Sequence, residues 1–114
     1  MTLLSIITPT LARTKYLKKN LKEIDLLSKD FRSFEWVVVI ENKDKITRKF
    51  FKQNNRKFIK KVIGNYNSAE LAFENGVEKS RGKYIKFHGD DDFFDTNNIK
   101  SLNNQLFKKN YSWI

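Results

Sequence analysis

Three consecutive carboxylates are the residues of this 114-residue sequence whose chemistry is easiest to name. Asp90, Asp91 and Asp92 follow a short apolar segment that ends at His88. Adjacent carboxylates repel one another, so a cation that neutralises them stabilises the group. Oxygen ligands without cysteine suit Mg²⁺ or Mn²⁺, which take the rest of their coordination shell from water and a bound phosphate. The triplet is therefore a candidate metal site, and a solvated loop whose acids cap the next helix is the alternative. We interpret His88 as a structural residue.

Polar residues also follow two other apolar segments. Thr8, Pro9, Thr10 and Arg13 come after the first, and their hydroxyls and guanidinium are groups that hold a base or a phosphate. Glu41 comes after the second, where an acid commonly hydrogen-bonds a ribose or base edge in nucleotide-binding sheets. Turn chemistry and helix capping are the plain alternatives for both groups. The sequence contains neither a GxGxxG pattern nor a Walker A pattern, so a dinucleotide fold and a P-loop NTPase have no support.

The elements that must position these residues are strands alternating with helices. The hydrophobic periodicity predicts strands at 3–8, 34–40, 58–63 and 83–88, helices at 14–28, 44–53, 68–80 and 96–109, and the start of a fifth strand at 111–114. This order is typical of α/β folds, and we expect a Rossmann-like, mostly parallel sheet with helices on both faces. The carboxyl ends of parallel strands meet at one edge, so the candidate residues should gather there. No linker or repeat divides the chain, which predicts a single domain over 1–114.

Composition narrows the function classes. The chain has no cysteine, which excludes a disulfide framework and a thiolate zinc site and leaves the cytoplasm as the expected compartment. Neither a leader nor a membrane-spanning segment is expected, because the first apolar run is short and has no basic residues ahead of it. The net charge is +10, and cations are densest over residues 43–61. That stretch favours an anionic partner, although a Lys-rich solvated surface is the plainer interpretation.

Four blocks, in order, carry a resemblance. They are 5–10 (Ser-Ile-Ile-Thr-Pro-Thr) with Arg13, then 35–42 (Glu-Trp-Val-Val-Val-Ile-Glu-Asn), then 75–77 (Asn-Gly-Val), then 82–92, which ends in Gly-Asp-Asp-Asp. Together they resemble family 2 glycosyltransferases of the GT-A fold, specifically the N-terminal part that binds the nucleotide-sugar. The sequence departs from the usual pattern at three places. Glu41 stands where the family usually has Asp, and Gly89 stands where many members have an acid. Residues 40–43 (Ile-Glu-Asn-Lys) replace the acid pair and Gly-Ser that normally follow the second strand.

The resemblance implies roles for named residues. It assigns nucleotide-sugar binding to Thr8, Pro9, Thr10, Arg13, Glu41 and Asp90, and binding of Mn²⁺ or Mg²⁺ to Asp91 and Asp92. It places the catalytic base in an acceptor-binding half that this sequence lacks, so the chain is expected to be an incomplete enzyme.

The implied activity is transfer of a sugar, of the hexosyltransferase type, from a nucleotide-diphospho-sugar to a cell-envelope polysaccharide or a lipid-linked acceptor. The enzyme would work in the cytoplasm at the inner face of the membrane, with the basic stretch 43–61 as a peripheral contact. The alternative is a small basic module that binds nucleic acid or an anionic membrane surface. Nucleic acid is the less favoured partner, because aromatic residues do not interleave the lysines. A degenerate, inactive gene product is a third possibility.

Overall fold

Strands and helices alternate along the chain, as the periodicity predicts. A computed structural model describes residues 2–11 and 14–90, and the predicted helix at 96–109 and strand at 111–114 lie outside that range. The elements are β1 (Leu4–Thr10), α1 (Thr14–Leu27), β2 (Phe34–Glu41), α2 (Lys45–Gln53), β3 (Ile59–Gly64), α3 (Ala69–Lys79) and β4 (Tyr84–Phe87). The four strands form one parallel sheet in the order β3-β2-β1-β4. The predicted α/β class is confirmed, and the single-domain prediction for 1–114 stays a prediction.

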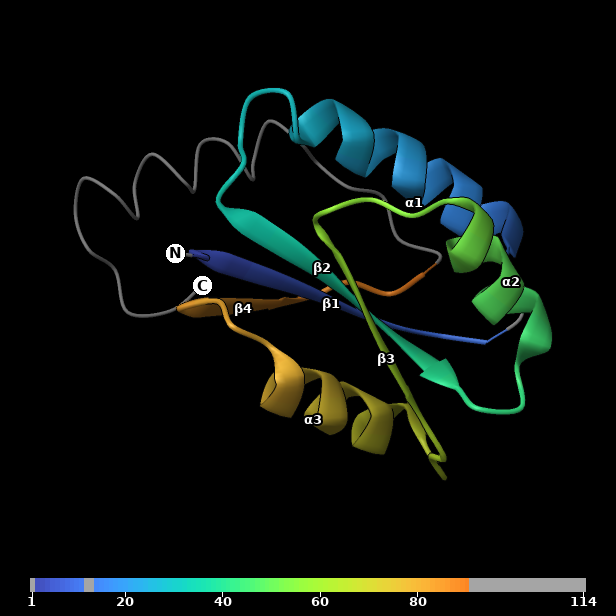
Figure 1. Ribbon diagram of the computed structural model, residues 1–114. Coiled ribbons are helices and arrows are strands. Elements are labelled where there is room, and N and C mark those ends of the chain that lie inside the picture. The colour runs from blue at the N-terminus through green and yellow to red at the C-terminus, as the bar shows by residue number, and fades with distance from the viewer. Residues whose placement is uncertain (1, 12–13, 91–114) are drawn as a thin grey trace.

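Helices cover both faces of the sheet (Figure 1). On one face α1 and α2 bury a large core around Trp36 and Phe51, whose rings meet edge to face at 5.6 Å. On the other face α3 packs over a smaller core that contains Ile7 and Val39. Both faces of β2 are therefore buried, which explains its nearly continuous apolar sequence. In the described residues, none of the helices has the length and apolar character needed to cross a bilayer.

The first strand is longer than predicted. The sequence places its end at Thr8 because of Pro9, but β1 continues to Thr10 and pairs with β2 up to Ile40. The backbone oxygen of Ile7 accepts from the His88 N–H at 2.9 Å, so Ile7 and, two residues later, Pro9 direct their backbone groups towards β4. Pairing between β1 and β4 ends at Ile7. The Pro9 nitrogen, which carries no hydrogen, therefore points to the β4 side of β1, beyond the last residue pair of the β1–β4 ladder. No ladder hydrogen bond is lost there, so the strand tolerates the proline.

A buried polar network fastens β4 to the rest of the sheet at the amino ends of the strands. The Ser5 hydroxyl donates to Glu35 Oε2 at 2.6 Å and accepts from the Gly82 N–H at 2.7 Å, and the Arg81 N–H donates to the same Glu35 oxygen. Ser5 and Glu35 are both buried. A side chain at position 82 would collide with the backbone of Leu4 and Ser5, which explains the glycine. The network holds the start of β4 beside β1.

Candidate functional site

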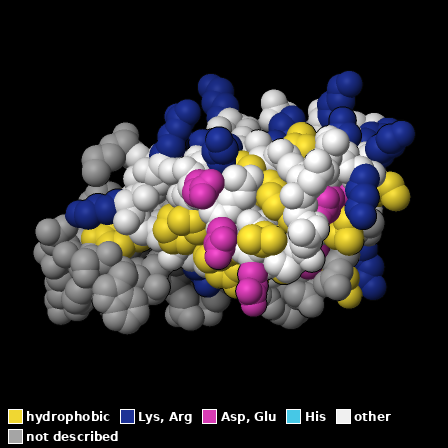
Figure 2. Space-filling view, turned by 90° about the horizontal axis from the view of Figure 1, so that it is seen from below, with side chains coloured by type: hydrophobic (Ala, Val, Ile, Leu, Met, Phe, Trp, Pro, Cys, Tyr) yellow, Lys and Arg dark blue, Asp and Glu magenta, His cyan; other side chains and the backbone are white. Residues whose placement is uncertain are grey.

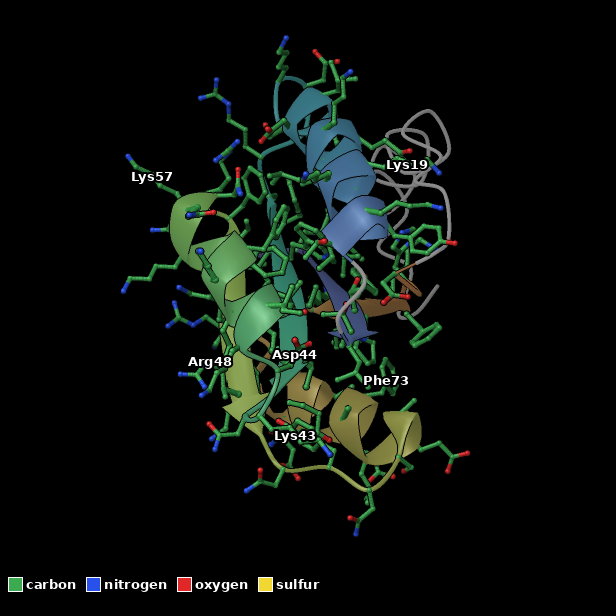
Figure 3. All side chains as sticks on the ribbon, turned by 90° about the vertical axis from the view of Figure 1, so that its right-hand side faces the viewer. Lys19, Lys43, Asp44, Arg48, Lys57 and Phe73 are labelled. Carbon is green, nitrogen blue, oxygen red and sulfur yellow. The ribbon has the colours of Figure 1, made fainter. Side chains whose placement is uncertain are left out.

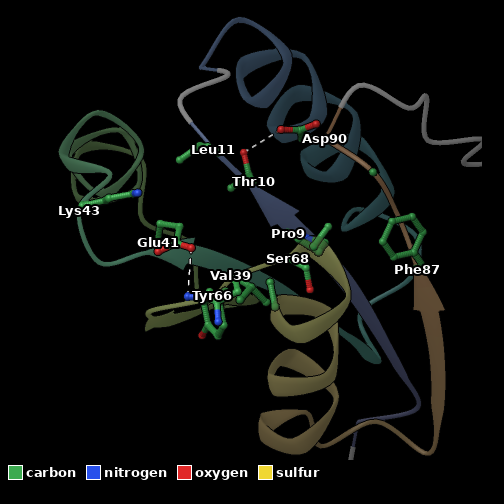
Figure 4. Close-up of a pocket in the computed structure, with 14 residues that line it drawn as sticks. Pro9, Thr10, Leu11, Val39, Glu41, Lys43, Tyr66, Ser68, Phe87 and Asp90 are labelled. Carbon is green, nitrogen blue, oxygen red and sulfur yellow. Dashed lines mark hydrogen bonds between the residues drawn. The ribbon is translucent and has the colours of Figure 1, made fainter.

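A cavity of about 500 Å³ lies where the carboxyl ends of the strands meet (Figure 4). The sheet order reverses between β1 and β4, and ligands of open α/β sheets bind in the crevice at such a point. The cavity is lined by Pro9, Thr10, Leu11, Val39, Glu41, Lys43, Tyr66, Asn67, Ser68, Ala69, Ala72, Phe87, Gly89 and Asp90. Four of the residues predicted for the site, Pro9, Thr10, Glu41 and Asp90, are among them.

The first strand contributes Pro9 and Thr10 to the cavity, whereas Thr8 lies elsewhere. Thr8 is fully buried, and its hydroxyl accepts a hydrogen bond from Trp36 Nε1 at 2.9 Å. Side chains alternate between the two faces of a strand, so Thr8 points towards the core under α1 and α2 while Pro9 points towards α3. Arg13, the fourth predicted contact of this segment, lies outside the described residues.

Hydrogen bonds from β1 and α1 hold Asp90 at the cavity. The Thr10 hydroxyl donates to Asp90 Oδ2 at 2.9 Å (Figure 4), and the Asn20 side-chain amide donates to the Asp90 backbone oxygen at 2.7 Å. All three residues are buried. Asn20 lies on the inward face of α1 among leucines, and its Oδ1 accepts no hydrogen bond from the described residues. The end of β4 is thus fixed against β1 and α1.

Glu41 is held by the backbone that follows β3. Its Oε1 accepts the Tyr66 N–H at 3.0 Å (Figure 4). Burial raises the pKa of the Tyr66 phenol, and the nearby negative charge of Glu41 raises that pKa further. The phenol donates to Asn75 Oδ1 at 2.6 Å, which anchors Tyr66 to α3. Glu41 therefore reaches the cavity in a fixed position.

The opposite wall of the cavity is the start of α3. Ser68 caps this helix by accepting the Leu71 N–H at 3.2 Å, so the amino end of the helix, with its partial positive charge, borders the cavity. Lys43 adds a full positive charge at the rim. The cavity thus combines two carboxylates, Glu41 and Asp90, with positive charge, an arrangement that suits a ligand carrying both hydroxyl and phosphate groups.

The predicted metal ligands Asp91 and Asp92 lie outside the described residues. Within residues 2–11 and 14–90, no three acidic, histidine or cysteine side chains gather closely enough to hold a metal ion. Asp90, the first acid of the triplet, is buried and lines the cavity.

The predicted basic stretch lies apart from most of the cavity, on α2, β3 and the loop between them. Three of its cations make contacts within the molecule. Arg56 pairs with Asp25 at 3.1 Å, Arg48 Nη1 donates to the backbone oxygen of Asn42 at 2.7 Å, and Lys60 Nζ donates to the backbone oxygen of Lys79. Lys43 alone of the stretch lines the cavity.

Several lining residues are absent from the predicted site. Tyr66, Asn67 and Ser68 follow β3 in the same way that Glu41 follows β2, so the rule of strand carboxyl ends applies to them equally. Asn20 could also have been singled out from the sequence, because an amide among the leucines of an amphipathic helix needs a buried hydrogen-bond partner.

Comparisons with known proteins support the fold. No family model and no curated protein matches the sequence. Among solved structures, S. aureus TarS 1–349 superposes with a TM-score of 0.77 at 22% identity, covering 96% of this chain and 33% of that one. A second structure of S. aureus TarS gives a TM-score of 0.70 at 20% identity, covering 94% of this chain and 20% of that one. TarS is a family 2 glycosyltransferase, so the fold implied by the resemblance is the fold found. The chain spans about one third of the first structure and one fifth of the second.

Proposed function

We propose that this chain is the donor-binding part of a glycosyltransferase and binds a nucleotide-diphospho-sugar in the cavity at the carboxyl ends of its strands. The observation that carries the proposal is the convergence of Pro9, Thr10, Glu41 and Asp90, which come from three separate segments, on one cavity of about 500 Å³. The shared fold with S. aureus TarS supports it. A volume of this size suits a small-molecule ligand.

Different residues of the cavity are proposed to contact different parts of the donor. Glu41 Oε1 is occupied by the Tyr66 N–H, whereas Oε2 has no partner among the described residues and can accept from a ribose hydroxyl or a base N–H. Lys43 and the amino end of α3 provide positive charge for the diphosphate. Thr10 holds Asp90 in place, and Arg13 is proposed as a further contact to the donor.

Asp91 and Asp92 are proposed to hold Mn²⁺ or Mg²⁺, with Asp90 as the buried anchor of the triplet. A divalent ion bound there would stabilise the negative charge that develops on the leaving diphosphate. Such a cation would offset the mutual repulsion of neighbouring carboxylates.

The transfer itself requires a second substrate. The acceptor hydroxyl would form a bond to the anomeric carbon, the bond from that carbon to the diphosphate oxygen would break, and the nucleoside diphosphate would leave with the bonding electrons. A carboxylate base would take the hydroxyl proton, and we assign none to the described residues. A glycan or lipid-linked acceptor at the cytoplasmic face of the membrane is the proposed partner, and hexosyl transfer the proposed reaction type.

The donor proposal is tested by calorimetry with UDP and other nucleoside diphosphates, each with Mn²⁺, with Mg²⁺ or with a chelator. We expect at least one nucleotide to bind in a metal-dependent way, and Asp91→Ala to abolish that dependence. Asp30→Ala, which removes an exposed acid in the turn after α1, is the matched control and should leave it unchanged. Nucleotide binding that is the same with and without the metal, and the same in Asp91→Ala, would contradict the metal assignment. If none of the nucleotides bound, the proposal itself would be contradicted.

A further inference from the structure

One side of the molecule carries exposed cations over the whole length of the sheet. Figure 3 shows Arg48 and Lys57 extending away from the ribbon on the side of α2, with Lys43 towards the other end. We call this surface the basic face. It consists of Lys43, Lys45, Arg48, Lys49, Lys52, Lys57 and Lys61, all exposed.

The charge of the basic face is nearly uncompensated. Helix α2 contains no acid. Asp44, which precedes it, is buried and caps the helix by accepting the Thr47 N–H. Lys45, Lys49 and Lys52 form no ion pair with any described residue. A surface with this density of unpaired cations attracts anionic partners.

The opposite face of the sheet has a different character. Helix α3 exposes Glu70, Glu74 and Glu78. Figure 2, which looks at this face, shows acidic and apolar side chains in its middle and lysine and arginine around its edge. The exposed surface of α3 therefore carries acids, whereas the exposed surface of α2 carries only cations among its charged residues.

Two aliphatic side chains lie among these cations. Ile46 on α2 is 62% exposed, and Ile63 on β3 is 47% exposed. Val62 packs in the core under α3, so Ile63 and Lys61, on the other side of β3, face the same way as α2. The aromatic residues of α2, Phe50 and Phe51, are buried, which leaves no stacking surface for bases on this helix. Cations around exposed aliphatic residues suit a lipid surface better than a nucleic acid.

A second cavity, of about 440 Å³, lies at the far end of the basic face. Lys29, Arg32 and Lys57 line it together with Ser28, Phe34 and Phe58. The three cations around an aromatic floor suit a phosphate group, and they extend the basic face beyond α2. At the other end, Lys43 belongs both to the basic face and to the cavity at the strand carboxyl ends.

We infer that the basic face docks this chain on a bilayer of anionic lipids. Charge complementarity attracts the face to lipid phosphates, and Ile46 and Ile63 contact the boundary between headgroups and acyl chains. Docking in this orientation brings Lys43, and with it the mouth of the cavity at the strand carboxyl ends, close to the membrane plane. A lipid-linked molecule would then meet the cavity without leaving the bilayer.

The test is sedimentation of the full 114-residue chain with vesicles of phosphatidylcholine alone or mixed with phosphatidylglycerol. We expect binding to the anionic vesicles only, weakening as salt is raised. Each lysine near an anionic surface contributes about fivefold to the partition constant, so the triple substitution of Lys45, Lys49 and Lys52 to Gln should lower it by about a hundredfold. Ile46→Ser should lower it further at every salt concentration, because the apolar contact is not screened.

The matched control removes the same charge elsewhere. Lys79 ends α3, and Arg81 and Lys83 lie in the segment between α3 and β4. Their triple substitution to Gln should change vesicle binding little. Equal losses in both triple variants, no binding by the parent chain, or tighter binding to single-stranded RNA than to vesicles would overturn the inference. Nucleotide binding measured on the same proteins separates the two proposals, because neither triple variant alters the cavity that holds the donor.

Discussion

The hydrogen bond between Thr10 and Asp90 should affect both the stability of the fold and ligand binding at the proposed site. Thr10→Val replaces the hydroxyl with a methyl group of nearly the same size and removes only the donor to Asp90 Oδ2. Asp90 keeps the hydrogen bond from Asn20 to its backbone oxygen, so the chain should keep its fold. The variant therefore reports how strongly the Asp90 carboxylate depends on β1.

The expected cost follows from burial. Asp90 is 7% exposed, so water replaces the lost donor poorly. A hydrogen bond to a charged group contributes about 1.5–3 kcal/mol, and we expect the free energy of unfolding to fall by about 2 kcal/mol. This corresponds to a drop in Tm of about 10 °C for a chain of this size. If the freed carboxylate also loses its orientation at a cost of about 1.4 kcal/mol, metal-dependent nucleotide binding should weaken about tenfold.

The assays are urea denaturation followed by circular dichroism and calorimetry with UDP and Mn²⁺. The chain offers a matched control in Thr47, whose hydroxyl donates to the buried Asp44 Oδ2 at 2.6 Å. Neither Thr47 nor Asp44 lines the cavity. Thr47→Val should lower the free energy of unfolding by a similar amount and leave nucleotide binding unchanged.

Two results would refute this reasoning. If Thr10→Val were as stable as the parent chain, the Thr10–Asp90 hydrogen bond would not stabilise the fold. If Thr10→Val and Thr47→Val weakened nucleotide binding equally, the effect would come from general destabilisation, and Asp90 would have no specific part in the site.

Two further predictions concern the phenol of Tyr66 and the close contact at Gly82. The pKa of Tyr66 is raised by burial and then by Glu41, so Tyr66 contributes stability that is complete below its ordinary value of 10.0 and is lost as the pH rises through the folded pKa. Glu41→Gln should lower that pKa towards 10.0 without reaching it, measured by phenolate absorbance against Tyr66→Phe, and an unchanged titration would exclude the charge effect. Gly82→Ala would place a Cβ 2.5 Å from the Ser5 nitrogen and 2.8 Å from the Leu4 carbonyl carbon. We therefore expect the free energy of unfolding, measured by urea denaturation, to fall by about 1–3 kcal/mol. Stability equal to that of the parent chain would mean that the turn adapts.

The elements of the fold were predictable because each has a clear local pattern. Helix α1 repeats leucine and isoleucine at three- and four-residue spacing, and β2 is apolar from Phe34 to Ile40. The end of β1 was mispredicted because Pro9 interrupts a strand only where its N–H is needed. Whether it is needed depends on where β4 stops, which is a property of the assembled sheet.

The location of the candidate site followed from topology alone. Parallel strands bring their carboxyl ends together, so Pro9, Glu41 and Asp90 were expected at one edge, and all three line the cavity. Whether a given side chain points into the core or into the cavity could not be predicted, because this depends on where the strand ends. Thr8 was assigned to donor binding, but β1 directs it into the core beside Trp36. The contact of Asn20 with Asp90 joins residues 70 positions apart, so no local pattern reveals it.

The polar network of Ser5, Glu35 and Gly82 lies at the amino ends of β1 and β4, opposite the cavity. It fixes which strand β4 pairs with, and it uses no residue that lines the cavity. The two ends of the sheet therefore use separate sets of side chains, one for strand order and one for the cavity. Substitutions in the loops after β1, β2 and β3 can change which ligand is recognised while the amino edge preserves the order of the strands.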